Sequence, residues 1–505
     1  MRITLVRPPF YALTGKTNAA HPLSLGYLSA ALTEAGEEVA IVDGEVLNFD
    51  HNKTGPLTNF KGYLFPYSGA SEKKRLLEEI MTDYHHPVWN RVIDRIVSTS
   101  PDVVGITCFT VSMTAVKIIV RKIVDKLPGV KVVLGGVHVT SLPEQSLRDL
   151  TDVTCLVLGE GENTVVELVK ELKKDNFSLS TVNGIAYLDS CGKFVQTSPR
   201  ELIPDLDDLP LPTRGWNGHR DYPLHLGFTS RGCPYACNFC DSRSIWTRKV
   251  RYTSLQRVKD ELSQLSDVGV NYFRYADDTF TLDVKRSADW CDLVRANGFN
   301  KTIKFSFTTR VELINRERVE DYKSAGVVNI AFGLETGSKR LSKLISKDFR
   351  KVDPFEAVKT ASDAGISTTT FIMIGHPTET PEDVIETANL IKNLKSLHRN
   401  YVDINVVCPY PGTDLWPICF EKSNGKEFIN IDTYYKMFHQ GVPIINLTDM
   451  TDDELESWIQ ALYRLATLSV FKSRFMMWGG QLVKNPLVTL KTLNKVMFPK
   501  QAYNL

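Results

Sequence analysis

The sequence lacks the features that mark membrane-spanning, secreted and nucleic-acid-binding proteins. No apolar run approaches the roughly 20 residues that a membrane span needs. The opening stretch, MRITLVRPPF, is interrupted too early by Arg7, Pro8 and Pro9 to act as a signal peptide. The formal net charge is only +1 over 505 residues, so no excess of one sign favours a nucleic-acid partner. These absences predict a cytoplasmic protein without a nucleic-acid partner.

Cysteine is sparse, and its distribution argues against a disulfide framework. The nine cysteines are an odd number on a long chain without a secretory signal. Six of them stand alone, where cysteine usually behaves as a small buried apolar residue. These six are Cys108, Cys155, Cys191, Cys291, Cys408 and Cys419. The other three, Cys233, Cys237 and Cys240, gather in one stretch, RGCPYACNFC.

Short β-branched runs alternate with helical stretches over residues 1–175. The strand-like runs include ITLVRP, EVAIVDG, DVVGITCF, KVVLGGVH and CLVLGEGE. Apolar strands separated by helices indicate a parallel sheet that helices cover on both faces. We therefore predict a doubly wound, Rossmann-like α/β domain whose ligands bind at the carboxyl ends of its strands. Residues 46–87 have weaker periodicity and are interpreted as an insertion.

A connecting region is predicted over residues 176–218. GIAYLDSCGKFVQ resembles a small hairpin. It is followed by PDLDDLPLPTR, where the density of prolines and acids is typical of a semi-extended linker.

A second βα series, over residues 219–420, contains six strand-like runs: HLGFTSRG, YFRYADD, KFSFTTRVE, NIAFGLET, STTTFIMIG and YVDINVVCPY. Six parallel strands in succession predict a partial (β/α)6 barrel, whose active residues follow the strand ends. The cysteines, Asp277-Asp278, Glu335 and GHPTE (375–379) all stand at such ends. Residues 421–505 are predicted to be a helical C-terminal region.

The spacing C-x3-C-x2-C indicates a soft or borderline metal. A structural zinc site usually has four ligands, so zinc would need a histidine such as His219 or His225. A ferredoxin-type cluster would need a remote fourth cysteine. A [4Fe–4S] cluster held by only three thiolates leaves one iron open to a substrate, and this interpretation needs no further residue.

The same stretch resembles the signature of radical S-adenosylmethionine (SAM) enzymes, which also have an aromatic residue before the last cysteine, here Phe239. In that family the open iron chelates SAM, and one electron cleaves SAM to methionine and a 5′-deoxyadenosyl radical. The radical removes hydrogen from an unactivated carbon, while the barrel orients the cofactor and excludes water.

The resemblance extends over about residues 220–415 through YADDTF, the Arg at the end of KFSFTTR, FGLETGS, IGHPTET and PYPGT. It implies SAM-binding roles for Phe239, Asp277, Asp278, Arg310, Glu335, Ser338 and Gly375. The acid pair would hold the SAM amino group, Arg310 the carboxylate, and Glu335 the ribose hydroxyls. Taken alone, each could also be a solvated strand-end charge.

The N-terminal domain resembles the cobalamin-binding domain of B12-dependent radical SAM proteins, through RPPF, PLSLGYLSAAL, LGGVHVTSLPE and LGEGENTVVELV. The resemblance implies that Gly135, Gly136, Gly159 and Gly161 let the backbone approach cobalamin; tight βα turns are the alternative. The D-x-H-x-x-G motif that supplies a cobalt ligand elsewhere is absent, and His138 is interpreted as a satisfied turn histidine. The lower cobalt face is therefore open to residues 11–18 or to CFTVSM (108–113).

This pairing of domains implies a cobalamin-dependent methyltransferase acting on an unactivated carbon, with a [4Fe–4S] cluster, SAM and cobalamin as cofactors. The alternative on the same scaffold is a radical SAM cyclase or oxidoreductase that acts on a lipid, isoprenoid or tetrapyrrole type of substrate, with cobalamin optional. A third class is a non-catalytic binding protein with a structural metal loop. The implied partners are a small-molecule substrate, with a hydrophobic molecule as one option, and an electron donor such as flavodoxin or ferredoxin.

The C-terminal tail predicts peripheral membrane contact. Residues 471–500 carry six Lys or Arg, no acid and many apolar side chains, a pattern typical of segments that lie on anionic membranes. Packing of the tail on the barrel is the alternative. We expect the full chain to float with anionic liposomes and a chain ending at residue 470 to float less. Equal flotation of the two chains would contradict the membrane interpretation.

Overall fold

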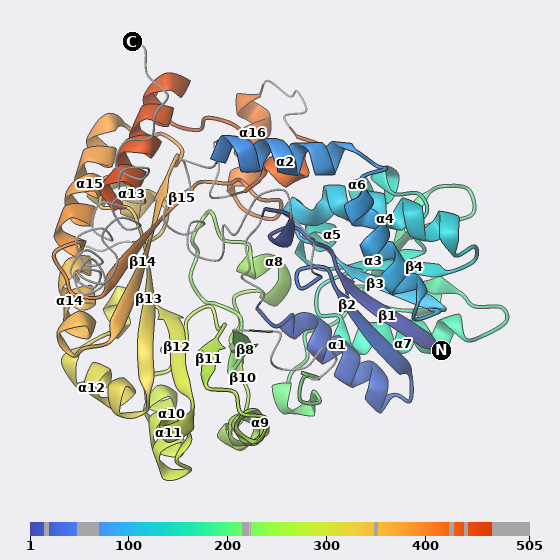
Figure 1. The fold of residues 1–505 in the computed structure, drawn as a ribbon, viewed down its shortest axis with the longest axis horizontal. Helices are drawn as coiled ribbons and strands as arrows, with labels where there is room; N and C mark the ends of the chain where they lie inside the picture. Colours follow the sequence, from blue (N-terminus) through green and yellow to red (C-terminus); the bar gives the residue numbers. More distant parts are fainter. Residues whose placement is uncertain are drawn as a thin grey trace, which may run out of the picture.

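The computed structural model describes residues 1–14, 20–47, 70–214, 222, 224–347, 352–423, 429–438 and 443–466. Two α/β bodies lie side by side, with helix α8 (Ser242–Trp246) between them in the view of Figure 1. The predicted tail, residues 471–500, lies outside the described residues, as do residues 15–18 of the first strand-end loop and His219.

The N-terminal body contains a seven-stranded sheet in the order β2-β1-β3-β4-β5-β6-β7. Its parallel strands are β1 (Arg2–Arg7), β2 (Glu38–Asp43), β3 (Val103–Thr107), β4 (Lys131–Gly135) and β5 (Cys155–Val157). The order reverses between β1 and β3, so the carboxyl ends of these two strands flank the crevice where ligands bind in such sheets. The predicted doubly wound domain is confirmed.

Alternating apolar side chains give this sheet a core on each face. Ile3 and Leu5 pack with α1 (Leu23–Glu34) and α7 (Glu162–Leu172). Val6, Val104 and Ile106 pack with the helices of the other face. These helices are α2 (Ala70–Thr82), α3 (Pro87–Val97), α4 (Met113–Lys126) and α6 (Pro143–Asp149). Within the predicted insertion, α2 thus contributes to the core through Leu77, Ile80 and Met81.

The predicted hairpin exists but belongs to the first sheet. Strands β6 (Ile185–Leu188) and β7 (Phe194–Gln196) are antiparallel, and β6 pairs with β5. A parallel edge strand exposes unpaired backbone groups, and the hairpin covers that edge. The hairpin therefore extends the N-terminal sheet. The domain boundaries at residues 175, 218 and 420 stay predictions.

The second body is a six-stranded parallel sheet in the order β15-β14-β13-β12-β11-β8. Its strands are β8 (His225–Gly227), β11 (Tyr272–Tyr275), β12 (Lys304–Thr309), β13 (Val327–Glu335), β14 (Ser367–Ile374) and β15 (Asn400–Val406). The intervening helices include α9 (Leu255–Asp267), α10 (Val284–Ala296), α12 (Arg316–Ser324), α14 (Pro354–Asp363) and α15 (Pro381–Leu394). Because β8 and β15 are edges of one sheet, the barrel is partial, as predicted.

The C-terminal region contacts both bodies. After α16 (Leu415–Lys422), residues 429–438 pack into the N-terminal core, where Thr114 Oγ1 donates to the Ile431 carbonyl at 2.7 Å. Residues 452–466 then form a helix whose apolar side chains join the barrel core. The sequence predicted helices here but not this crossing between the two bodies.

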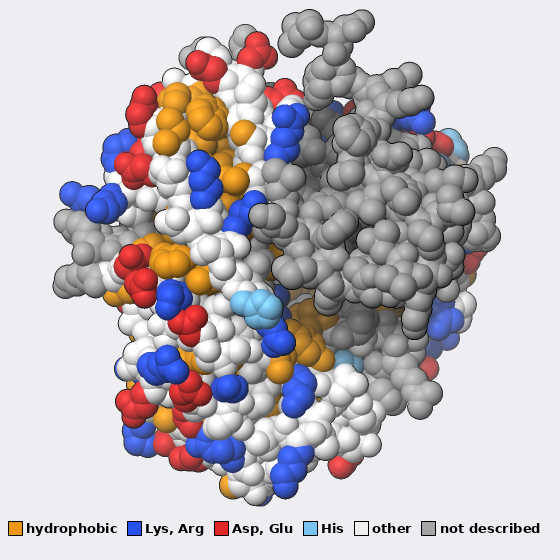
Figure 2. Space-filling model, turned by 60° about the vertical axis from the view of Figure 1, so that its left-hand side comes forward, with side chains coloured by type: hydrophobic (Ala, Val, Ile, Leu, Met, Phe, Trp, Pro, Cys, Tyr) orange, Lys and Arg blue, Asp and Glu red, His pale blue; other side chains and the backbone are white. Residues whose placement is uncertain are grey.

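Charges are mixed on the face of the barrel that Figure 2 shows, with basic and acidic side chains interspersed over its described part. This is the pattern that a net charge of +1 leads us to expect. Within the described ranges, no helix is long and apolar enough to cross a membrane.

Candidate cofactor site

The three cysteines lie in the loop between β9 (Ser230–Arg231) and α8, beyond the carboxyl end of β8, and all three are partly exposed. Gly232, which precedes this loop, has a φ of +99°, and a Cβ there would stand 2.3 Å from the Lys249 carbonyl oxygen. A side chain at residue 232 would therefore push the loop away from β10 (Arg251–Tyr252).

The donor set of this loop, three cysteine thiols, suits a soft metal ion or an iron–sulfur cluster. Across the described residues, no three His, Cys, Asp or Glu converge closely enough to hold one metal ion. A [4Fe–4S] cluster binds each thiolate to a different iron, so its cysteines can stand farther apart. Burial raises the pKa of Cys240 to about 11, so a metal bound there would have to displace a proton from that thiol.

Arg310 lies directly against the cysteine loop, at the end of β12. Its Nη1 is 3.8 Å from Cys237 Sγ, and its guanidinium carbon is 3.9 Å from the centroid of the Tyr235 ring. It also pairs with Glu312. The structure thus places a held positive charge beside a thiol of the cysteine loop.

The two acids after β11 occupy different environments. Asp277 is 3% exposed and accepts hydrogen bonds from Thr229 N (3.0 and 3.2 Å), Thr229 Oγ1 (2.8 Å) and Ser230 Oγ (2.5 Å). Both of its oxygens are therefore used inside the protein. Asp278 is exposed, and its carboxylate accepts a hydrogen bond from Ser242 Oγ at 2.5 Å. Burial is the main cause that raises the pKa of Cys233 and of Cys240, and the negative charge of Asp278 raises both further.

Glu335 ends β13 with a φ of +66°, which is rare for a residue other than glycine, and its side chain is buried. Its Oε1 accepts from Lys347 Nζ at 2.6 Å, and the same ammonium donates to the Gly333 carbonyl at 2.9 Å. Lys347 Nζ is also 5.8 Å from the centroid of Phe239, the aromatic residue of the cysteine loop. Sequence reasoning missed Lys347, because it stands outside every motif.

The structure gives Ser338 an internal role. It begins α13 (Lys339–Leu344) by accepting from Leu341 N, and its Oγ donates to Asp383 Oδ1 at 2.5 Å. These bonds join the end of β13 to α15.

Gly375 lies at the end of β14, close to a buried polar group. Its N–H donates to Glu379 Oε2 at 2.6 Å, as does the N–H of His376 at 3.0 Å. The ring of His376 is 6.1 Å from that of Phe239, and both of its nitrogens are buried without a hydrogen-bond partner among the described residues. Such orphaned groups are rare in native proteins and fit a site that a ligand or water completes.

The four glycines of the N-terminal body divide into two kinds. A Cβ at Gly136, where φ is +112°, would stand 2.8 Å from the Cys108 carbonyl oxygen, and one at Gly161 would meet Leu28 at 3.3 Å. Both therefore have packing reasons. A Cβ at Gly159 would meet nothing within 4 Å, and one at Gly135 nothing closer than 3.7 Å, so protein atoms leave space beside the backbone there. The φ of +69° at Gly159 also favours glycine in that turn.

His138 is buried and bonded, as predicted. Its Nδ1 lies 3.1 Å from Thr110 Oγ1, and its ring packs edge-on to Tyr434 at 4.8 Å. Burial lowers its pKa to about 4, so the imidazole is neutral at physiological pH.

A buried ionic network joins the two bodies next to the cysteines. Arg231 donates to Glu160 Oε1 at 2.8 Å and to Glu162 Oε1 at 2.5 Å, and Arg251 donates to both oxygens of Glu160. The backbone N–H of Ile203, in the linker, also donates to Glu160. Burial alone would raise the pKa of Glu160, but the two guanidinium groups outweigh it and lower that pKa. Glu160 and Glu162 therefore connect the N-terminal body to Arg231, which stands two residues before Cys233.

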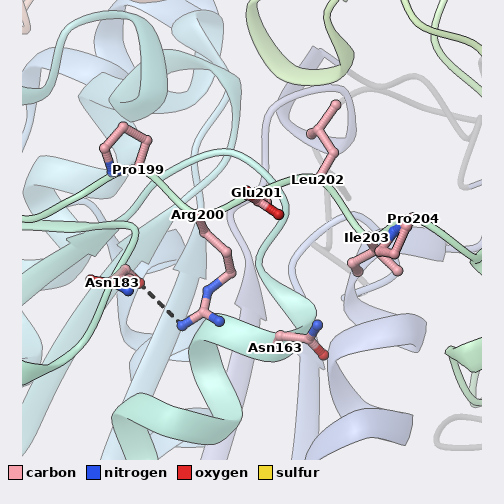
Figure 3. A pocket seen from close by; sticks show the side chains of 8 residues that line it. All are labelled: Asn163, Asn183, Pro199, Arg200, Glu201, Leu202, Ile203 and Pro204. Carbon is pink, nitrogen blue, oxygen red and sulfur yellow. Dashed lines mark hydrogen bonds between the residues drawn. The ribbon is translucent and has the colours of Figure 1, made fainter.

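A surface hollow of about 430 Å³ lies between the linker and α7. Figure 3 shows the labelled residues around it, with Arg200 reaching the Asn183 carbonyl at 3.4 Å. None of its lining residues belongs to the cysteine loop or to the strand-end motifs, so we do not place the substrate there.

The chain matches two family models. Residues 228–391 match the Radical SAM superfamily, and residues 70–169 match the B12 binding domain. An uncharacterized methyltransferase of Pyrococcus horikoshii is 30% identical over 452 residues, which cover 87% of this chain and 88% of that protein. The chain belongs to the radical SAM enzymes that carry a B12-binding domain. The predicted family and pairing of domains are thereby confirmed.

Two further proteins are similar to this radical SAM enzyme, one in sequence and one in fold. An anaerobic magnesium-protoporphyrin IX monomethyl ester cyclase of Cereibacter sphaeroides is 27% identical over 398 residues; the chain spans 63% of that longer protein. The solved structure of TsrM, a radical SAM methyltransferase of Kitasatospora setae with cobalamin and a [4Fe–4S] cluster bound, has a TM-score of 0.64 at 17% identity, covering 84% of this chain and 78% of that one. At this identity, the likeness to TsrM shows the fold.

We expect Glu160→Ala to lower the free energy of unfolding by about 3–5 kcal/mol, because it leaves two buried guanidinium groups facing each other. The measurement is urea unfolding. The matched control is Asp94→Ala, which breaks the exposed Lys126–Asp94 pair and should cost at most about 1 kcal/mol. Similar losses in both variants would show that the network contributes no more than a surface pair.

The buried carboxyl group of Glu379 is expected to make the stability of the protein depend on pH. Burial raises its pKa from 4.5 to about 7. Between these values the folded chain holds a proton that the unfolded chain has released, so this group makes stability fall as pH rises through the window. Relative to Glu379→Gln, the wild type should lose on the order of 3 kcal/mol between pH 4.5 and 7. Glu382→Gln, an exposed change three residues further on in α15, should leave the pH profile unaltered. Equal pH profiles of the wild type and Glu379→Gln would contradict the prediction.

Proposed function

We propose that this radical SAM enzyme is a cobalamin-dependent methyltransferase that methylates an unactivated carbon of a small molecule. The observation that carries the proposal is the buried connection between the cysteine loop of the barrel and the LGEGE loop of the B12-binding domain. It holds the two candidate cofactor sites in a fixed relation, as a transfer between them requires. The relative in Pyrococcus horikoshii, named a methyltransferase, supports the same reading.

In this proposal Cys233, Cys237 and Cys240 hold a [4Fe–4S] cluster. When bound, the cluster supplies the electron that cleaves SAM to methionine and a 5′-deoxyadenosyl radical, and cobalamin supplies a methyl group. Arg310 stabilises charge beside Cys237 and binds the SAM carboxylate.

The remaining predicted residues divide into groups that bind SAM and groups that position them. Asp278 binds the SAM amino group, because it is the exposed acid near the thiols. Glu335, oriented by Lys347, binds the ribose, and Gly375 and Phe239 line the path of the adenosine. For Asp277 and Ser338 we propose positioning roles, since their oxygens are already bonded. Gly135 and Gly159 lie against cobalamin, while Gly136 and Gly161 shape the same two turns.

The partners belong to the same proposal. A flavodoxin or ferredoxin would donate the electron. The basic, aromatic tail would bring the enzyme to a membrane surface, where a hydrophobic substrate is found.

A second candidate function is a radical SAM cyclase or oxidoreductase. It is favoured by the similarity to the cyclase of Cereibacter sphaeroides. The two functions differ in their products: methyl transfer yields S-adenosylhomocysteine as well as 5′-deoxyadenosine, whereas the alternative yields 5′-deoxyadenosine without S-adenosylhomocysteine.

The test begins with the metal content of protein purified without oxygen from cells supplied with cobalamin. We expect about four irons and one cobalt per chain, with S-adenosylhomocysteine formed under reducing conditions. Iron without cobalt, and no S-adenosylhomocysteine, would move the assignment to the second function. Cys237→Ala should lose the iron and the cleavage of SAM, while Cys191→Ala, an exposed control, should keep both.

The two acids after β11 supply a matched pair of variants. Asp278→Asn should weaken SAM binding by about 10- to 100-fold, the value of a lost charge-assisted hydrogen bond, with stability unchanged. Asp277→Asn should lower stability instead, because an amide cannot accept all the hydrogen bonds that reach this carboxylate. The measurements are equilibrium binding of SAM to the iron-loaded protein and urea unfolding. The opposite assignment of the two effects would show that Asp277 is the ligand.

A further inference from the structure

The lower face of cobalt, meaning the face turned toward the N-terminal sheet, has no ligand assigned by the sequence. The substrate and SAM come from the barrel, so this face belongs to the loops at the carboxyl ends of β1 and β3. A side chain that covers the lower face of cobalt must therefore come from one of these loops.

In the described part of the loop after β1, residues 8–14, contacts within the protein hold the backbone and both aromatic rings. Glu45 accepts the backbone N–H groups of Phe10, Tyr11 and Ala12 at 2.7–3.0 Å. The rings of Phe10 and Tyr11 pack edge-on against Phe438 of the C-terminal region, at 5.6 and 5.8 Å.

The loop after β3 presents one free side chain. The backbone of Phe109 is extended, with φ −97° and ψ 151°. Its side chain therefore points away from the side chain of Cys108, which is fully buried in the core of the N-terminal body. Ser112 Oγ fixes this geometry by accepting from the Phe109 N–H at 3.2 Å and donating to the Phe109 carbonyl at 2.9 Å. Phe109 is 51% exposed, the largest fraction of any large apolar side chain among the described residues.

The histidine of this edge is turned away. His138 donates its backbone N–H to the Cys108 carbonyl at 3.2 Å, and its ring is enclosed by Thr110 and Tyr434. Residues 70–169, which match the B12 binding domain, include both Phe109 and His138. An exposed phenyl ring on a fixed backbone at the crevice is suited to packing against the flat, largely apolar face of a corrin.

We propose that Phe109 covers the lower face of cobalt, so that no protein nitrogen coordinates the metal there. This inference rests on the proposed cobalamin dependence and deepens it by assigning the residue that excludes a lower ligand.

The test is electron paramagnetic resonance of cob(II)alamin bound to the wild type and to Phe109→His. We expect no protein-derived nitrogen splitting in the wild type and a triplet splitting in Phe109→His, because the introduced imidazole would reach cobalt. Labelling histidine with ¹⁵N should convert this triplet to a doublet, which separates a protein ligand from the benzimidazole of cobalamin. Phe420→His, an exposed change on α16, is the control and should resemble the wild type.

The outcomes separate this inference from the proposed function. Bound cobalamin with the same spectrum in Phe109→His and wild type overturns the inference alone, as does a ¹⁵N-sensitive splitting in the wild type. Failure of the wild type to bind cobalamin overturns both. Should Phe109→His not bind cobalamin, Phe109→Ala decides: weaker binding with altered axial cobalt parameters supports the inference, and unchanged affinity and spectrum overturn it.

Discussion

The carboxylate of Glu160 is the group on which the arrangement of this enzyme depends. It is 3% exposed and lies between two guanidinium groups that are each 4% exposed. A buried guanidinium without its carboxylate carries a large desolvation cost, so neither body can move from the other without exposing or stranding charge. The network joins a loop of the B12-binding domain to Arg231, and through Gly232 to the first cysteine of the cluster loop. Interdomain geometry is thereby tied to the candidate metal site.

The C-terminal region adds a second connection of a different kind. Residues 429–438 bury apolar side chains in the N-terminal core, and residues 452–466 bury theirs in the barrel core. Apolar burial is non-directional and opposes separation of the bodies, whereas the ionic network requires one particular orientation. Together they hold the two bodies in one relative orientation, so that the sheet edges with the two candidate cofactor sites stay in a fixed relation.

The pattern of residues predicted those parts of the molecule that depend on local order along the chain. Alternating strands and helices predicted both sheets, and the cysteine spacing with strand-end motifs predicted the edge at which the candidate site lies. Sequence reasoning could not separate Asp277 from Asp278, because adjacent residues share a motif while only their orientations differ. It could not find Lys347, which reaches Glu335 only because the chain turns back after α13. Nor could it assign Glu160 and Glu162 to the ionic network, since their partners Arg231 and Arg251 are about 70 to 90 residues away.

The sequence by itself determined the fold class, the pairing of two domains and the three thiols, because periodicity and short-range spacing record which faces are buried and which ligands can converge. The tertiary structure alone decided which acids are free and which are bonded, that the hairpin completes the first sheet, and that Phe109 stands exposed beside an enclosed His138. These properties depend on contacts between residues far apart in the chain. Burial and charge pairing arise only when such segments meet, and no local pattern specifies them.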